Sequence, residues 1–156
     1  MSGSFTTIVN HELFYYLLDL EVKRATRYSY FFSLLFIELD QEDDPDDTIN
    51  MVAKLILNEI REVDIVGKIE KKRFSALLQA ETKPTQTIAE RIRGRILNYS
   101  FTDEAPAEKQ RRTISVGGAC FPTHGTDASE LNSQALHLLE KARVDGGNRV
   151  YVHGMV

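Results

Sequence analysis

The segment from Arg61 to Phe74 reads Arg-Glu-Val-Asp-Ile-Val-Gly-Lys-Ile-Glu-Lys-Lys-Arg-Phe. It contains an apolar, β-branched run that ends at Ile69, then a charged stretch over 70–73, then a second apolar run that begins at Phe74. Two short apolar runs separated by a charged turn are typical of paired antiparallel strands. The sequence therefore predicts a β-hairpin at this point of the chain.

The segments around this hairpin alternate between helical and strand patterns. Apolar residues at helical spacing predict an amphipathic helix over His11–Arg27. The continuous apolar run Phe31–Leu39 is typical of a central strand covered on both faces. An acidic loop, Asp40–Asp47, follows it, and Asp47 or Thr48 is predicted to cap the next helix. Later patterns predict a helix, a strand, a helix and a strand over 85–99, 112–121, 129–143 and 148–153.

Composition places the chain among ordinary globular proteins. It has 156 residues, of which 42% are hydrophobic and 27% are charged, so we expect residues 1–156 to form one domain around one core. The longest apolar stretch, Tyr28–Ile37, is too short to span a bilayer, and the first residues lack a signal-peptide pattern. We therefore expect a cytoplasmic protein without a membrane partner.

Charge and metal-ligating residues exclude two further classes of function. The net charge of −4 is spread over both signs with no long basic run, which argues against nucleic acid as a partner. The single cysteine excludes an internal disulfide, and the 4 histidines are scattered without ligand spacing. We therefore expect no metal site.

Five pieces of the chain share the order and spacing of one known family. They are Asn10 with Phe14; Leu34 to Asp40; Asp64, Lys68 and Phe74; Thr113 to Ala119 with Pro122 and Gly125; and Ala142-Arg143 followed by Gly146, Asn148, Arg149 and Val150. These pieces resemble the GGDEF domain family, the bacterial diguanylate cyclases. The resemblance covers nearly the whole chain. It implies an α/β (α+β) fold that is nucleotidyl-cyclase-like and ferredoxin-like, with a mixed central sheet of about five strands flanked by helices.

The chain departs from this family at the hairpin motif. Where the family reads Gly-Gly-Asp/Glu-Glu-Phe, this chain reads Glu70-Lys71-Lys72-Arg73-Phe74. The resemblance places a Mg²⁺-binding carboxylate at Lys72 and a glutamate at Arg73, so positive charge stands where the metal ion would lie. Glu70 and Lys71 replace the glycines that let the backbone approach phosphates. The motif is therefore degenerate.

Other catalytic positions are only partly kept. The family's Asp-x-Asp at the end of the first long strand stands here as Glu38-Leu39-Asp40, and Arg143 keeps a cation at the family's lysine position. The interval between Asp40 and Asp64 is shorter than in the family, and the missing part should read the guanine base. An active diguanylate cyclase is therefore the least favoured interpretation. We expect a signalling domain that is not an enzyme and needs no cofactor, Mg²⁺ included.

A second motif of the family is retained. Arg61-Glu62-Val63-Asp64 resembles the Arg-x-x-Asp inhibitory site that binds cyclic di-GMP, and Asp64 lies in register, six residues before Glu70. The resemblance implies that Arg91 supplies the site's second arginine. A guanidinium can bond guanine O6 and N7, and a carboxylate can accept from N1 and N2. The interpretation is a cyclic di-GMP receptor that binds through Arg61, Asp64 and Arg91.

A different class of function remains open. Arg61 near a helix end and Asp64 at a strand start are also favourable without any ligand. In the alternative interpretation the domain is a ligand-free interaction or dimerisation module. In a dimer, the cations Lys71, Lys72 and Arg73 would then face the acidic loop, residues 43–47, of the second copy. The partner could also be another signalling protein.

Overall fold

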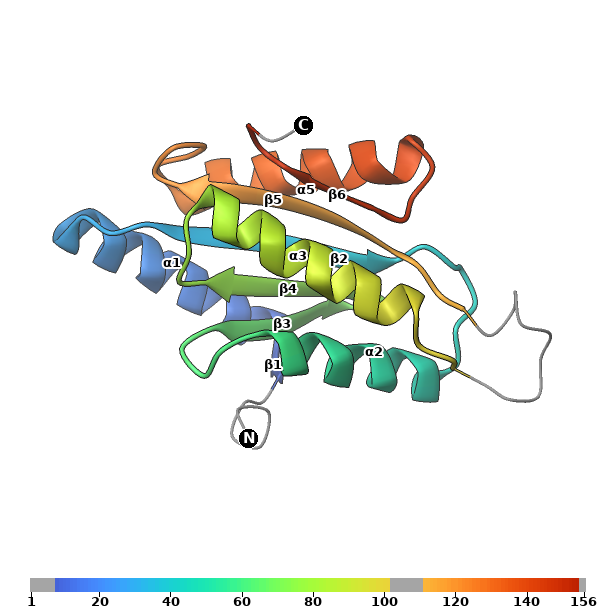
Figure 1. Ribbon diagram of the computed structural model, residues 1–156. Helices are drawn as coiled ribbons and strands as arrows, with labels where there is room; N and C mark the ends of the chain where they lie inside the picture. Colours follow the sequence, from blue (N-terminus) through green and yellow to red (C-terminus); the bar gives the residue numbers. More distant parts are fainter. Residues whose placement is uncertain (1–7, 102–110, 155–156) are drawn as a thin grey trace.

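The computed structural model of the chain describes residues 8–101 and 111–154, which form a sheet flanked by helices (Figure 1). The strands are β1 Ile8–Asn10, β2 Phe32–Leu39, β3 Ile65–Glu70, β4 Arg73–Leu78, β5 Ile114–Phe121 and β6 Arg149–Val152. The helices are α1 His11–Tyr28, α2 Asp46–Glu59, α3 Thr82–Leu97 and α5 Ala128–Val144. In the part of the chain described, none of these helices combines the length and apolar character needed to cross a bilayer.

The sheet has six strands in the order β1-β3-β4-β2-β5-β6. Strand β1 runs parallel to β3 and β6 runs parallel to β5, while the other neighbours are antiparallel. The predicted mixed sheet is confirmed, with one strand more than expected. The additional strand is β1, which has three residues and is too short to show a periodicity in the sequence.

The helices cover both faces of the sheet. Helices α2 and α3 pack on one face and α1 and α5 on the other, as the front and rear layers of Figure 1 show. All eight residues of β2 are buried, as predicted for a central strand. Because side chains alternate along a strand, Leu35 and Ile37 point toward α2 and α3, whereas Leu34 and Phe36 point toward α1 and α5.

Two predicted helix starts are wrong. Helix α2 begins at Asp46 with Pro45 as its N-cap, so the predicted caps Asp47 and Thr48 lie inside the helix, and no side chain caps it. Helix α3 begins at Thr82, three residues before the predicted start. Pro84 lies in its first turn, where the missing N–H has no partner within the helix, so the proline does not interrupt it.

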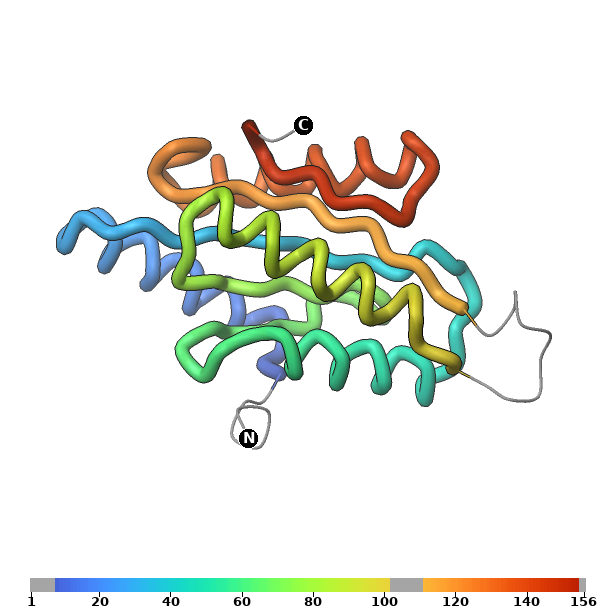
Figure 2. The backbone as a smooth tube through the Cα atoms, viewed as in Figure 1, coloured from blue at the N-terminus to red at the C-terminus, as the bar shows by residue number. Residues whose placement is uncertain are grey.

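The predicted hairpin is confirmed, and its position shows which connections lie at each end of the sheet. Strands β3 and β4 are antiparallel, and β4 pairs with β2 so that Arg73 lies opposite Glu38. Figure 2 shows the hairpin turn, the end of β2 and the α5–β6 connection at one end of the sheet. The α2–β3 and β4–α3 connections lie together at the other end. The predicted site residues are therefore divided between two ends.

Gly117 provides a test of how closely α5 packs on the sheet. A Cβ at Gly117 would overlap Leu139 N and Ala135 O, which are backbone atoms of α5. We expect Gly117→Ala to lower the free energy of unfolding by about 1–3 kcal/mol in urea denaturation. Gly94→Ala is the control, because a Cβ there meets nothing within 4 Å. It should raise the free energy of unfolding by about 0.5–1 kcal/mol. Equal losses in the two variants would contradict this packing.

Candidate functional site

Glu38, which the sequence resemblance places at a metal-binding carboxylate position, lies at the first of the two ends. It is only 4% exposed. Arg73 Nε, from the facing strand β4, donates to Glu38 Oε1 at 2.9 Å. Arg143, from the last turn of α5, pairs with the other oxygen, Oε2. Two cations of the chain itself therefore neutralise the Glu38 carboxylate.

Asp40 lies at the same end of the sheet, and both of its carboxylate oxygens accept hydrogen bonds from the chain. Its Oδ1 accepts from Ser115 Oγ at 2.6 Å, and its Oδ2 accepts from Thr113 Oγ1 at 2.6 Å and from Asn148 N at 2.9 Å. A Cβ at Gly147, where φ is +71°, would lie 2.9 Å from the Asp40 carboxyl carbon. Asp40 thus joins the ends of β2, β5 and the segment before β6.

Sequence reasoning gave these three donors no role toward Asp40. Thr113, Ser115 and Asn148 lie 73, 75 and 108 residues beyond Asp40, and nothing local in the sequence marks such a pairing. In the sequence they stand only within the segments that carry the family resemblance.

The three hairpin cations differ in their contacts within the chain. Lys72 Nζ donates to the backbone oxygen of Gln41 at 2.7 Å, and Arg73 is held by Glu38. On the acidic loop, Asp44 is 5% exposed and pairs with Arg112 at 2.6 Å. Lys72 and Arg73 thus make contacts within the chain, and the contact of the three hairpin cations with an acidic loop of a second copy stays a prediction. Glu70 and Lys71 are exposed.

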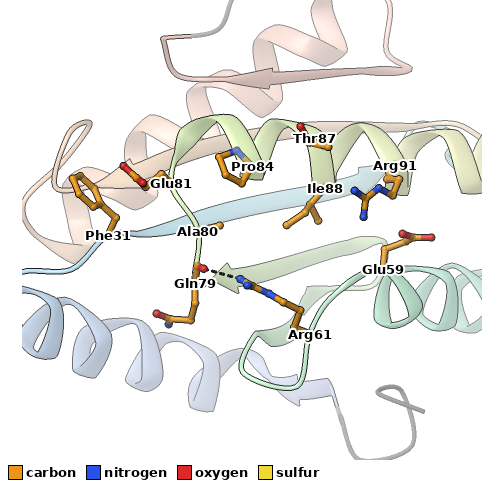
Figure 3. Close-up of a pocket in the computed structure, with 10 residues that line it drawn as sticks. All are labelled: Phe31, Glu59, Arg61, Gln79, Ala80, Glu81, Pro84, Thr87, Ile88 and Arg91. Atoms are coloured by element: carbon orange, nitrogen blue, oxygen red, sulfur yellow. Dashed lines mark hydrogen bonds between the residues drawn. The ribbon is translucent and has the colours of Figure 1, made fainter.

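A cavity of about 660 Å³ lies at the other end of the sheet (Figure 3). It opens between the α2–β3 connection, the β4–α3 connection and helix α3. Its lining residues are Phe31, Glu59, Arg61, Gln79, Ala80, Glu81, Pro84, Thr87, Ile88 and Arg91. The structure thus brings Arg61 and Arg91, two of the three predicted ligand-binding residues, to one cavity. We call it the arginine cavity.

Asp64, the third predicted residue, does not line the arginine cavity. Its side chain has no exposed surface. Its Oδ2 accepts from Arg61 N at 3.0 Å and lies 3.4 Å from Arg61 Nε, and its Oδ1 accepts from Gln79 N at 2.9 Å. The predicted direct contact of Asp64 with guanine is therefore corrected. Asp64 is placed to position Arg61.

Arg61 and Arg91 differ in the contacts that their side chains make with the rest of the chain. Arg61 lies just after the end of α2 and donates from Nη2 to the backbone oxygen of Gln79 at 2.6 Å. Arg91 is exposed on α3, and its side chain has no hydrogen bond or ion pair with any other described residue. Glu59, one of the two acidic residues of the lining, pairs with Arg95 at 2.8 Å. The lining therefore holds two arginines and two glutamates beside the exposed ring of Phe31, and the carboxylate of Glu59 is engaged by an arginine outside the lining.

The family of the chain is decided by a match over most of its length. Residues 3–149 match the family model described as "Diguanylate cyclase, GGDEF domain". This chain belongs to the GGDEF family. The resemblance inferred from the five sequence pieces is thereby confirmed at the level of the family.

Individual relatives of this GGDEF chain are distant in sequence. It is 25% identical over 161 residues to the probable diguanylate cyclase DgcT of Escherichia coli. That match covers 97% of this chain but only 35% of DgcT, so the chain spans about a third of its curated relative.

Solved GGDEF structures share the fold closely. The active GGEEF domain of a diguanylate cyclase from Vibrio cholerae has a TM-score of 0.85 at 18% identity, over 96% of this chain and 100% of that one. The GGDEF domain of DgcB from Caulobacter crescentus, solved in complex with c-di-GMP, has a TM-score of 0.82 at 19% identity. That match covers 94% of this chain and 89% of the DgcB domain. At such identities these likenesses show the fold alone.

Proposed function

We propose that this GGDEF domain is a catalytically silent receptor that binds cyclic di-GMP in the arginine cavity. The observation that carries the proposal is the meeting of Arg61 and Arg91, from separate elements, in one open cavity of about 660 Å³. Guanidinium groups bond bidentately to guanine O6 and N7 and to phosphate oxygens. The ligand contains both groups.

The state of each arginine favours a ligand with these groups. Because Arg91 has no partner among the described residues, it can bond a guanine or a phosphate without breaking an existing ion pair. Arg61 is held from behind by Asp64, so little side-chain entropy is lost when its exposed part binds. The exposed ring of Phe31 offers a surface on which a base can stack. The complex of the related DgcB domain with c-di-GMP supports this choice of ligand.

The proposal of catalytic silence rests on the opposite end of the sheet. Mg²⁺ needs carboxylate oxygens that are free to coordinate it. Glu38 is already bound by Arg73 and Arg143, and these cations would repel a third. Asp40 accepts three hydrogen bonds from the chain. The residues present therefore do not fit a Mg²⁺ ion.

The neighbouring surface is also poorly suited to a triphosphate. A cavity of about 390 Å³ next to Glu38 is lined by Asp40, Glu140, Arg143, Val144, Gly146 and Gly147. Its two carboxylates outnumber its single cation, so the net local charge opposes a polyanion.

Thermal unfolding with two nucleotides tests the proposal. A ligand that binds only the folded state stabilises it by about 2.7 kcal/mol at a concentration of 100 Kd. Cyclic di-GMP should therefore raise the Tm by several degrees, whereas GTP with Mg²⁺ should leave it unchanged. The GTP sample, analysed by chromatography beside an active diguanylate cyclase, should contain no cyclic di-GMP. Product that accumulates in proportion to the protein would contradict the silence of this domain.

A protein-interaction module is the second candidate. Leu13 is 44% exposed and Tyr16 is 63% exposed on α1, and Val63 is 63% exposed in the α2–β3 connection. Leu13 and Tyr16 are three residues apart on one helix and so lie side by side, which offers an apolar surface to another protein. If the contact is instead the charged one between Lys71 and the acidic loop, self-association should weaken as salt rises. Sedimentation at low and high salt distinguishes the two contacts.

A further inference from the structure

Gln79 connects the arginine cavity to helix α1. Its backbone faces the cavity residues, since Gln79 O accepts from Arg61 Nη2 at 2.6 Å and Gln79 N donates to Asp64 Oδ1 at 2.9 Å. Its side chain turns away from the cavity toward α1, as Figure 3 shows. There Gln79 Nε2 donates to Glu21 Oε2, on the third turn of α1. One residue therefore touches both Arg61 and α1.

Glu21 depends on this contact. It is 7% exposed and makes no ion pair with any residue that the structure describes. Its other oxygen accepts from Tyr30 Oη at 2.7 Å. Burial and this hydrogen bond to Glu21 raise the pKa of Tyr30 to about 12, so the phenol keeps its proton and remains a donor at neutral pH. A buried carboxylate without a cation is stabilised only by such donors. Loss of the Gln79 amide should therefore disturb Glu21.

Gln79 also lies between two cavities. Besides the arginine cavity, it lines a cavity of about 360 Å³ on the α1 side, together with Leu17, Leu20, Glu21, Arg24, Tyr30, Val63 and Ile65. Rotation of the Gln79 side chain would change both cavities at once.

We propose that Glu21 and Gln79 are positioning residues for Arg61, so that the packing of α1 and the occupancy of the arginine cavity are coupled. The proposal rests on the proposed function in that its ligand is cyclic di-GMP. The Glu21 carboxylate anchors the Gln79 side chain, the anchored residue fixes its own carbonyl, and this carbonyl holds Arg61 Nη2. A preorganised guanidinium loses less entropy on binding, which increases affinity.

Two substitutions that exchange the amide at position 79 with the carboxylate at position 21 test the proposal. Gln79→Glu places two carboxylates together, and it should weaken cyclic di-GMP binding about tenfold, within the usual range of coupling between sites. Adding Glu21→Gln to that variant should restore the affinity, because the new amide at position 21 donates to the new carboxylate at position 79. Glu12→Gln, an exposed change on the same helix, is the control and should have no effect. Titration calorimetry measures all four proteins.

Amide hydrogen exchange at position 79, measured without ligand, provides a second readout. Gln79→Glu should speed exchange of this amide, and the swapped pair should slow it again. If the wild-type chain binds no cyclic di-GMP but exchange follows this pattern, the proposed function fails while the positioning of Arg61 stands. If Gln79→Glu changes neither affinity nor exchange, or if the swap restores neither, the positioning proposal is overturned.

Discussion

Replacing Glu38 with alanine is expected to lower the free energy of unfolding by about 3–5 kcal/mol, the usual cost of removing one partner from a buried ion pair. Glu38 is 4% exposed and lies between two guanidinium groups. Without it, Arg73 and Arg143 would face each other with no buried anion between them. The side chain of Arg73 is only 17% exposed, so water would screen this repulsion weakly.

Glu140→Ala is the matched control for this prediction. Glu140 lies 3.7 Å from Arg73 and 3.9 Å from Arg143, but its side chain is 57% exposed. Exposed pairs contribute at most about 1 kcal/mol, so this variant should unfold almost like the wild type in urea. Similar losses for the two variants would show that the buried pairing of Glu38 does not stabilise this end of the sheet.

The second large effect is expected on ligand affinity. A hydrogen bond to a charged group contributes about 1.5–3 kcal/mol, so removal of each cavity arginine should weaken cyclic di-GMP binding roughly 10- to 100-fold. The double variant Arg61→Ala, Arg91→Ala should therefore lose at least about 100-fold. Both side chains are exposed in this structure, so the variants should still fold.

A lysine outside the arginine cavity provides the control that separates loss of a specific contact from loss of one positive charge. Lys83 is exposed in the first turn of α3 and does not line the arginine cavity. Lys83→Ala should change the affinity less than about twofold. Fluorescence polarisation with a labelled ligand measures all of these proteins. Equal loss in Lys83→Ala and Arg91→Ala would indicate nonspecific attraction of an anion rather than a site.

The fold could be predicted from the sequence where an apolar pattern extends over many residues. The continuous apolar run of β2 and the helical spacing of the apolar residues of α1 are clear signals, and both elements lie close to their predicted bounds. The short strand β1 has no period of its own and forms only because β3 offers it an edge. The start of α2 was missed because Pro45 serves as N-cap without a side-chain hydrogen bond.

The site was harder to predict from the sequence because its contacts join residues that are far apart along the chain. The family resemblance indicates Arg61 and Arg91 as ligand-binding residues, and the structure brings them to one cavity. The burial of Asp64 depends on Gln79, which lies 15 residues later and carries no motif. The pairing of Glu38 with Arg73 spans 35 residues and arises from strand register. Such contacts follow from how the strands and helices assemble, which local sequence patterns do not specify.

The most direct measurement is calorimetric titration of the purified chain with cyclic di-GMP, with GTP and Mg²⁺ in a parallel run. The receptor account predicts saturable binding with a Kd in the micromolar range or tighter, which the double arginine variant loses. It also predicts no turnover of GTP. An absence of binding heat together with an unchanged Tm at millimolar cyclic di-GMP would contradict the receptor account and leave the interaction module.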